Sequence, residues 1–356
     1  MSNDRKRLSF LRVLGSLILA AVISIGLLLA VDVGLKQFFR QTAMRMPYYI
    51  LTGISMVVLF FLLVFPANRP LRGVKVFLRW VAVIAAVLVV WGAGTVWNLQ
   101  GDMIYITDQY EPASEAKIKA LPNAEEITVA GRKGLQYKGW LWKNAQGPAG
   151  LVIFFGGNAQ YAAQSTYYTM TDTAEAAVYT GYNYLMMDYP GYGLSQGEPG
   201  EESIYDMARA TWDHMTVRQD VLANKIVLAG WSLGTGTVSR LAAEKDPAGL
   251  ILMAPFYDGA ALINDFVDAQ VMQGPTRALV RYPYHSNEYA RKTTTRALII
   301  AATDDRMIPK AQAEKLAAEY PQHELVIVQG GHSAPYNSAE AAQAITAYLK
   351  QVLSQP

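Results

Sequence analysis

Three long stretches without a charged residue occupy most of the first 101 residues of this chain. They run over residues 13–31, 46–68 and 80–101, and the shortest of them has 19 residues. At about 1.5 Å per residue, a helix of that length extends about 28 Å, close to the hydrocarbon thickness of a bilayer. Aromatic residues lie near the ends of the second and third stretches, as they do at membrane interfaces. The sequence therefore predicts three transmembrane helices over these ranges, rather than buried core helices or a cleaved signal peptide.

The charged residues are divided unevenly along the 356-residue chain. Residues 1–101 hold eleven Lys or Arg and two acidic residues, whereas the remainder holds 20 basic and 27 acidic ones. Eight of the eleven cations lie in the N-terminal tail and the second loop, so the positive-inside rule places the N-terminus inside. Three spans then make this a multi-pass protein of the cell membrane, with its C-terminal part on the extracytoplasmic side. The acidic remainder argues against a nucleic-acid partner.

The rest of the chain is interpreted as a linker followed by one α/β domain. Residues 102–124 contain two prolines and are expected to be the linker. Over residues 125–356, a hairpin pattern is followed by short apolar runs that alternate with amphipathic segments. Such alternation is typical of a mostly parallel sheet covered by helices on both faces. The expected strands of this sheet lie at residues 151–155, 184–187, 225–229, 250–253, 297–301 and 325–328.

Two residue counts exclude several kinds of chemistry. The chain has no cysteine, which excludes disulfides, thiol catalysis and cysteine-bound zinc or iron–sulfur clusters. It has four histidines, none of them spaced from another as a pair of metal ligands. We therefore expect no metal site and no cofactor.

The clearest chemical signal is a Gly-x-Ser-x-Gly pentapeptide, Gly230 to Gly234, between an expected strand and an expected helix. A serine on such a sharp turn projects its oxygen from the sheet, and small flanking residues avoid clashes there. A second copy surrounds Ser195, but it follows a Tyr-Pro-Gly-Tyr turn and no helix follows it. Context therefore favours Ser232 as the nucleophile and makes Ser195 a loop residue.

An acid and a base follow two later strands. Asp304 and Asp305 come after the strand at 297–301, and His332 comes after the last strand on a glycine-rich loop. A carboxylate can hold a histidine in one tautomer, and that histidine can take the proton of a serine. We predict Asp305 as the acid, with Asp304 as the alternative, and His332 as the general base.

A glycine turn follows the first strand of the parallel sheet. Gly156 and Gly157 would let the backbone come close to a substrate, although an ordinary strand-ending turn has the same composition. The predicted oxyanion donors are the N–H groups of Asn158 and of Leu233, the residue after the nucleophile.

With these residues in place, the chain resembles the α/β-hydrolase fold superfamily of serine hydrolases. Within it, the chain is most similar to the membrane-anchored BEM46-type group, related to serine aminopeptidase-like hydrolases and protein depalmitoylases. The resemblance covers about residues 104–354 and rests on five motifs in a fixed order: FFGGNA (154–159), MDYPGYGLSQGEP (187–199), AGWSLGTG (229–236), DRMIP (305–309) and GGHS (330–333).

The resemblance implies the same catalytic assignment, with Ser232 as nucleophile, Asp305 as acid and His332 as base. Two features depart from the pattern of this group. Gly156 stands where the group often has histidine, and the group typically has one membrane span where this chain has three predicted ones.

Residues 255–295 would form a short lid between two strands of the sheet. Its aromatic residues, Phe256 and Tyr257 among them, either line an acyl pocket or pack the lid, and the sequence leaves both readings open. Together with Gly156, Gly157 and Trp231, these two form the set of candidate substrate-binding residues.

The sequence thus predicts a membrane-anchored serine hydrolase that cleaves an ester or thioester through an acyl-enzyme on Ser232. Its substrate would be a small-molecule or lipid-like acyl compound. Two alternatives remain, a peptidase of the serine aminopeptidase type and a non-catalytic membrane-tethered binding protein. The oligomeric state and the acyl chain are left open.

Overall fold

A computed structural model describes residues 94, 97, 100, 101, 104–145, 147–266 and 280–354 of the chain. Contacts divide the chain into two units, Met1–Met103 and Ile104–Pro356, and the second unit is described here. Apart from four isolated residues, the predicted transmembrane ranges lie outside the described residues. None of the helices within those described ranges is both long and apolar enough to span a bilayer.

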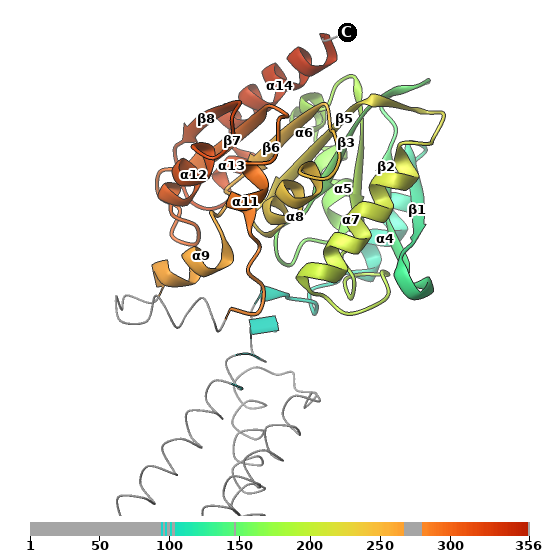
Figure 1. Cartoon of the computed structure of the whole chain (residues 1–356). Helices are drawn as coiled ribbons and strands as arrows, with labels where there is room; N and C mark the ends of the chain where they lie inside the picture. Colours follow the sequence, from blue (N-terminus) through green and yellow to red (C-terminus); the bar gives the residue numbers. More distant parts are fainter. Residues whose placement is uncertain are drawn as a thin grey trace, which may run out of the picture. The chain divides into compact units, whose positions relative to one another are not determined.

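Eight strands form one sheet, in the order β1-β2-β4-β3-β5-β6-β7-β8 (Figure 1). The hairpin of β1 and β2 and the pairing of β2 with β4 are antiparallel, and every other neighbouring pair is parallel. The strands are β1 (Ala124–Ala130), β2 (Gln136–Trp142), β3 (Ala149–Phe155), β4 (Tyr182–Met187), β5 (Val221–Trp231), β6 (Gly249–Met253), β7 (Ala297–Ala302) and β8 (His323–Val328).

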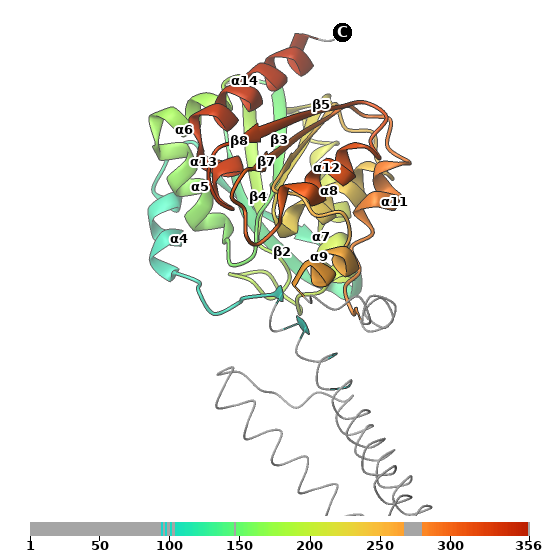
Figure 2. The same ribbon diagram turned by 90° about the vertical axis from the view of Figure 1, so that its left-hand side faces the viewer.

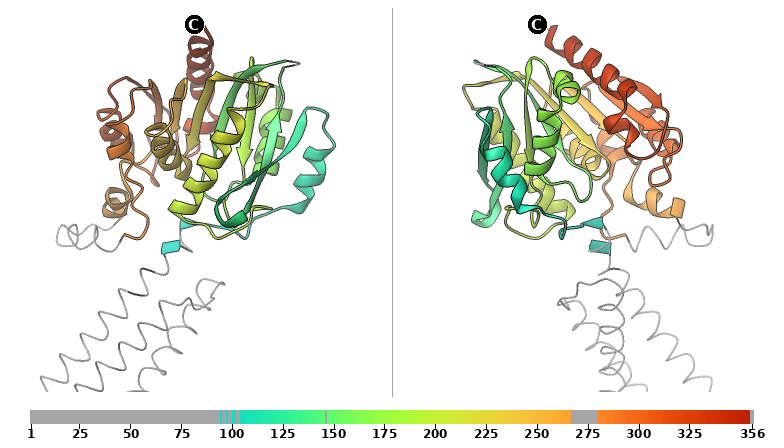
Figure 3. Two further views of the ribbon diagram at one scale, coloured as in Figure 1. Left: turned by 45° about the vertical axis from the view of Figure 1, so that its right-hand side comes forward. Right: turned by 180° about the vertical axis from the view of Figure 1, so that it is seen from behind.

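Helices cover both faces of this sheet, as the edge-on view in Figure 2 and the oblique and back views in Figure 3 show. One face carries α4 (Pro112–Lys119), α5 (Ala162–Thr171), α6 (Thr173–Val178), α13 (Ala334–Asn337) and α14 (Ala339–Ser354). The other carries α7 (Glu201–Met215), α8 (Leu233–Ala242), α11 (Ser286–Ala290) and α12 (Lys310–Ala317), with α9 (Gly259–Phe266) after β6.

The central strands are apolar throughout because both of their faces are buried. All seven residues of β3 are buried, and those from Leu151 to Phe155 alternate between two separate cores. Leu151 and Ile153 pack with the side chains of α7, α8 and α12, whereas Val152 and Phe154 pack with those of α4, α5 and α14. This is the arrangement expected of a parallel sheet between helical layers. The predicted α/β-hydrolase fold, with a mostly parallel sheet and helices on both faces, is confirmed.

The strand order reverses beside β3. From β3 the chain crosses to β4 on one side, and after α7 it returns to β5 on the other side. Parallel strands then continue outward to β8. In open α/β sheets, ligands bind beyond the carboxyl ends of the strands at such a switch point. Here that point is formed by the residues that follow Phe155 and Trp231.

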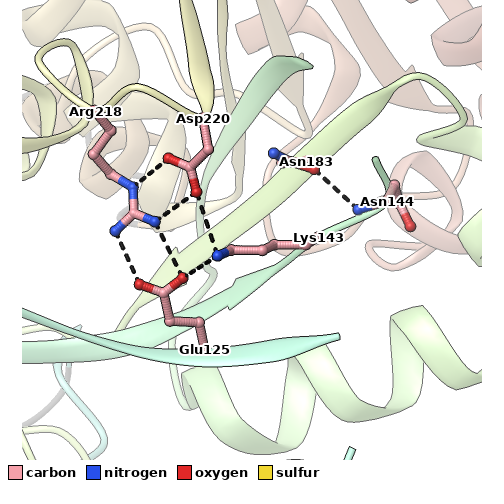
Figure 4. A network of polar contacts seen from close by, with 6 residues as sticks. All are labelled: Glu125, Lys143, Asn144, Asn183, Arg218 and Asp220. Carbon is pink, nitrogen blue, oxygen red and sulfur yellow. Dashed lines mark hydrogen bonds and ion pairs between the residues drawn. The ribbon is translucent and has the colours of Figure 1, made fainter. Parts of the chain in front are cut away.

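An ion network fastens the hairpin edge of the sheet (Figure 4). The guanidinium of Arg218 donates to both oxygens of Glu125 on β1 and to both oxygens of Asp220 before β5. Lys143, after β2, pairs with the same two carboxylates. These cations lower the pKa of both acids, to about 2 for Asp220. The network therefore joins the β1–β2 hairpin to the start of β5, about 90 residues further along the chain.

Candidate active site

Ser232 lies on the turn between β5, which ends at Trp231, and α8, which begins at Leu233. Its backbone has φ = 52° and ψ = −115°, in the region that residues with a side chain rarely adopt. Such a conformation persists only when the surroundings enforce it. The backbone N–H of Ser232 donates to the carbonyl of Met253 on β6, which helps to hold the turn.

The two glycines of the pentapeptide are required by close packing. A Cβ on Gly230 would lie 2.8 Å from the backbone of Gly234. A Cβ on Gly234 would lie 2.0 Å from the carbonyl oxygen of Phe155, the last residue of β3. The first turn of α8 therefore packs directly on the end of β3, which no larger residue would permit. The motif around Ser232 thus has the strand–turn–helix context that its chemistry needs.

The structure brings Ser232, His332 and Asp305 together. The Nε2 atom of His332 lies 3.0 Å from the Oγ of Ser232, and its Nδ1 atom lies 2.8 Å from Oδ2 of Asp305. Asp305 follows β7 and His332 follows β8, so three strand ends supply the three side chains. Both distances are those of hydrogen bonds. The arrangement can move a proton from the serine to the imidazole while the carboxylate stabilises the resulting cation.

The second oxygen of Asp305 is also occupied. Oδ1 accepts hydrogen bonds from the backbone N–H groups of Met307, at 2.9 Å, and Ile308, at 2.8 Å. The side chain of Asp305 is 1% exposed, against 15% for that of His332. Asp304, the alternative acid, is exposed and accepts a hydrogen bond from its neighbour Thr303. Of the two adjacent carboxylates, the structure places Asp305 against His332.

Trp231 packs against the loop that carries the histidine. Its ring centroid lies 5.3 Å from that of His332 and 5.3 Å from that of Tyr336, and its Nε1–H donates to the His332 carbonyl. A Cβ on Gly157 would lie 2.6 Å from the Trp231 ring, so that ring also requires a glycine in the turn after β3. Trp231 thus contacts both the histidine loop and the glycine turn.

The two predicted oxyanion donors follow neighbouring strands, Asn158 after β3 and Leu233 after β5. Phe155 of β3 is paired with Gly230 of β5, so the turn that leads to Asn158 lies beside the turn that carries Ser232. Leu233 is the first residue of α8, where backbone N–H groups have no partner within the helix. The partial positive charge of a helix N-terminus favours an anion at this position.

The remaining substrate-binding candidates occupy different environments. Phe256 is 4% exposed and packs edge-to-face on Tyr284 within the core. The hydroxyl of Tyr257 bonds to Glu319 and to Arg291, on the side of the domain formed by α11 and α12. The carbonyl of Gly156 accepts a hydrogen bond from the hydroxyl of Tyr189.

Ser195, from the second pentapeptide, has a different setting from Ser232. It is 7% exposed, and its hydroxyl donates to the carbonyl of Asp188 and accepts from the N–H of Lys138 on β2. These bonds attach the loop after β4 to the neighbouring strand. The hydroxyl of Ser195 therefore stabilises the conformation of that loop.

Asp188 is a buried acid next to this region. Burial raises its pKa to about 7, and the nearby Glu115 adds to the effect, although the N–H groups of Ala162 and Leu194 bond to the carboxylate. Its Oδ1 lies 2.7 Å from the N–H of Ala162, the first residue of α5. The carboxylate thus joins the end of β4 to the start of α5.

Three side chains that support the glycine turn could not be identified from the sequence. Gln160 accepts from the N–H of Gly157, Tyr189 donates to the carbonyl of Gly156, and Tyr192 donates to the side chain of Asn158. The two tyrosines belong to the Tyr-Pro-Gly-Tyr segment, which was noted only as a turn. Burial raises the pKa of both tyrosines, so both remain hydroxyl donors at neutral pH.

The fold and the site together define an enzyme of the α/β-hydrolase class. Its sheet, its strand order and the position of Ser232, Asp305 and His332 at the carboxyl ends of the strands agree with that class. A family model described as serine aminopeptidase, S33, matches residues 146–290 of the chain.

Relatives and solved structures agree with this class. An uncharacterized protein of Mycobacterium tuberculosis is 29% identical over 67% of this chain and 83% of its own. The α/β-hydrolase domain-containing protein WAV2 of Arabidopsis thaliana is 26% identical over 66% of this chain and 81% of its own. The structure of an esterase from Pyrococcus furiosus covers 69% of this chain and 97% of its own, with a TM-score of 0.53 and 14% identity. That last likeness concerns the fold alone.

Proposed function

We propose that the chain is a serine hydrolase that cleaves carboxylic esters or thioesters through an acyl-enzyme on Ser232. His332 takes the proton of the Ser232 hydroxyl as its oxygen attacks the substrate carbonyl, and Asp305 stabilises the imidazolium. The N–H groups of Asn158 and Leu233 bind the oxyanion. The imidazolium then protonates the leaving alcohol or thiol, and a water molecule activated by His332 releases the acid and restores the hydroxyl.

One observation carries this proposal. The hydroxyl of Ser232, held on a strained strand-to-helix turn, lies at hydrogen-bond distance from a histidine whose other nitrogen faces a buried carboxylate. A serine that served only the fold would not need a left-handed backbone and a histidine–aspartate pair beside it. The same geometry activates serine nucleophiles on unrelated folds.

A fluorophosphonate with a fluorescent reporter tests the nucleophile directly. We expect the full-length protein to be labelled and Ser232→Ala to lose all labelling. Ser195→Ala, which changes the serine of the second pentapeptide, is the matched control and should retain labelling once its folding is confirmed. Labelling that persists in Ser232→Ala would refute the assignment. A folded wild-type protein without any labelling would favour the non-catalytic binding protein.

A peptidase is the second candidate, because the matching family model is described as a serine aminopeptidase. It would use the same three side chains with an amine as leaving group. Ester and amide probes separate the two functions. Turnover of p-nitrophenyl esters with little turnover of aminoacyl anilides supports the esterase, and the reverse preference supports the peptidase.

We further propose that the enzyme is anchored in the cell membrane by three N-terminal helices, with the catalytic domain on the extracytoplasmic side. The uncharged stretches and the distribution of Lys and Arg in the first 101 residues support this placement. An anchored domain is suited to an acyl substrate that itself resides in or on the bilayer, such as a lipid or a lipidated molecule.

A further inference from the structure

The side chain of Asn158 joins three separate parts of the domain. Its Oδ1 accepts a hydrogen bond from the backbone N–H of Ile106 at 2.9 Å and from the hydroxyl of Tyr192 at 3.1 Å. Ile106 lies 52 residues before Asn158 in sequence, and Tyr192 lies 34 residues after it. Since a backbone N–H can only donate, the oxygen of the amide must face Ile106. One carbonyl group therefore fixes this residue to two distant segments.

The segment that contains Ile106 is defined here as the stem, residues 104–109. It begins the second unit of the chain and is itself fixed to the domain. The hydroxyl of Tyr105 lies 2.8 Å from that of Tyr284, and its ring packs edge-to-face on Tyr282 with centroids 5.0 Å apart. The N–H of Gln109 donates to the hydroxyl of Tyr161. The stem is therefore a fixed support for Asn158.

The turn that contains Asn158 has a strained backbone. Ala159 adopts φ = 61°, a left-handed conformation that is sterically unfavourable for a residue with a Cβ. On the other side of Asn158, the N–H of Gly157 donates to Oε1 of Gln160, and the N–H of Gln160 donates back to the carbonyl of Gly157. The direction of the Asn158 N–H therefore depends on bonds that keep the turn from relaxing.

From these contacts we infer that the side chain of Asn158 is a positioning group. The hydrogen bonds from Ile106 in the stem and from Tyr192 hold this side chain in place. The fixed side chain in turn sets the direction of the Asn158 backbone N–H, which donates to the oxyanion. This inference rests on the proposed hydrolase function. It makes the stem, through Ile106, a functional part of the catalytic domain.

Variants of the full-length protein test this role with p-nitrophenyl butyrate and its thiono analogue, whose C=S sulfur is a poorer acceptor for an oxyanion donor. Tyr192→Phe removes one bond to Asn158, and Asn158→Ala removes both. The control is Tyr182→Phe on β4, which removes a buried hydroxyl bond to Leu349 on α14 instead. It should lower thermal stability about as much as Tyr192→Phe without changing kcat.

We expect kcat for the oxygen ester to fall about 10-fold in Tyr192→Phe and about 100-fold in Asn158→Ala, with KM nearly unchanged. Outright loss of an oxyanion donor typically costs about 10²–10³-fold. Turnover of the thiono ester should fall much less, because less of its rate depends on these donors. Asn158→Asp keeps both acceptor contacts but places a negative charge beside the developing oxyanion, so it should also lose kcat.

The inference is overturned if Asn158→Ala and Tyr192→Phe keep kcat within twofold of wild type, or if both esters slow equally. An equal loss of kcat in Tyr182→Phe would also overturn it, because the effect would then be one of general stability. If the wild type reacts with the fluorophosphonate but not with the butyrate ester, the same comparison is made on the rate of labelling. Failure of the proposed function is distinct from these outcomes, since the wild type would then show no Ser232-dependent reaction at all.

Discussion

At the scale of single residues, the two carboxylate oxygens of Asp305 have separate hydrogen-bond partners and separate roles. One oxygen accepts two backbone N–H groups, and the other faces Nδ1 of His332. The backbone bonds fix the carboxylate, and the carboxylate fixes the tautomer of the imidazole. The orientation of His332 therefore depends on the loop after β7, which carries Asp305.

This division predicts the effect of Asp305→Asn. The oxygen of the amide can keep the bonds to Met307 and Ile308, which leaves the NH₂ group facing Nδ1 and forces the other tautomer. We expect kcat to fall by up to about 10⁴-fold with little loss of stability. The control is Asp304→Asn, which removes the adjacent exposed acid and should leave kcat unchanged. An Asp305→Asn variant with more than a tenth of wild-type kcat would contradict the role.

The principal residues of the candidate site could be predicted because each follows a strand. Ser232, Asp305 and His332 occur in the required order after apolar runs, and strand ends of a parallel sheet meet at one edge. The contact of Ile106 and Tyr192 with Asn158 could not be predicted, because it joins residues that are distant in sequence and share no pattern. The internal contacts of Tyr257 were equally inaccessible, since they depend on where α11 and α12 pack.

At the scale of elements, Asp188 joins β4 to α5 through a carboxylate that accepts hydrogen bonds from the backbone N–H groups of Ala162 and Leu194. Its pKa is raised to about 7, above the ordinary value of about 3.9. Between these two values the folded state holds a proton that the unfolded chain has released. The free energy of unfolding therefore falls as the pH rises from about 4 to about 7.

Asp188→Asn should remove this part of the pH dependence. Each unit of pKa difference corresponds to about 1.4 kcal/mol, so the effect is measurable. We expect the thermal midpoint of the wild type to decrease more between pH 5 and pH 7.5 than the thermal midpoint of Asp188→Asn. Both midpoints are measured by near-ultraviolet circular dichroism on the detergent-solubilised full chain. Asp304→Asn is again the control. Equal decreases in the wild type and in Asp188→Asn would contradict the prediction.

The elements themselves were predictable to different degrees. All six strands expected in the mostly parallel sheet exist. They could be predicted because buried strands are continuous apolar runs bounded by turn residues. The expected bounds of β5 were too short by four residues at its start, where residues 222–224 are exposed and the pairing with β3 is irregular. Helices α5 and α6 were not named from the sequence, since their tyrosines, threonines and alanines show no clear apolar periodicity. Helix α4 lies within the range that was interpreted as a linker.

At the scale of the whole molecule, the proposed placement of the domain outside the cell can be tested by cysteine labelling. The native chain has no cysteine, so a single introduced thiol reports on one position. Lys350→Cys, exposed on α14, should react with an impermeant maleimide in sealed right-side-out vesicles. Lys75→Cys, in the second predicted loop, is the matched control and should react only after permeabilisation. Labelling of position 350 only after permeabilisation would overturn the orientation.

The left-handed backbone of Ser232 has a consequence for how such a protein changes over time. Glycine adopts this conformation without steric strain, so a chain with glycine at this position would relieve that strain while lacking the hydroxyl. Selection for stable folding alone would therefore favour glycine at position 232, which would give a protein with the same fold and no nucleophile. The serine at this position therefore meets a demand of chemistry that runs against the preference of the backbone.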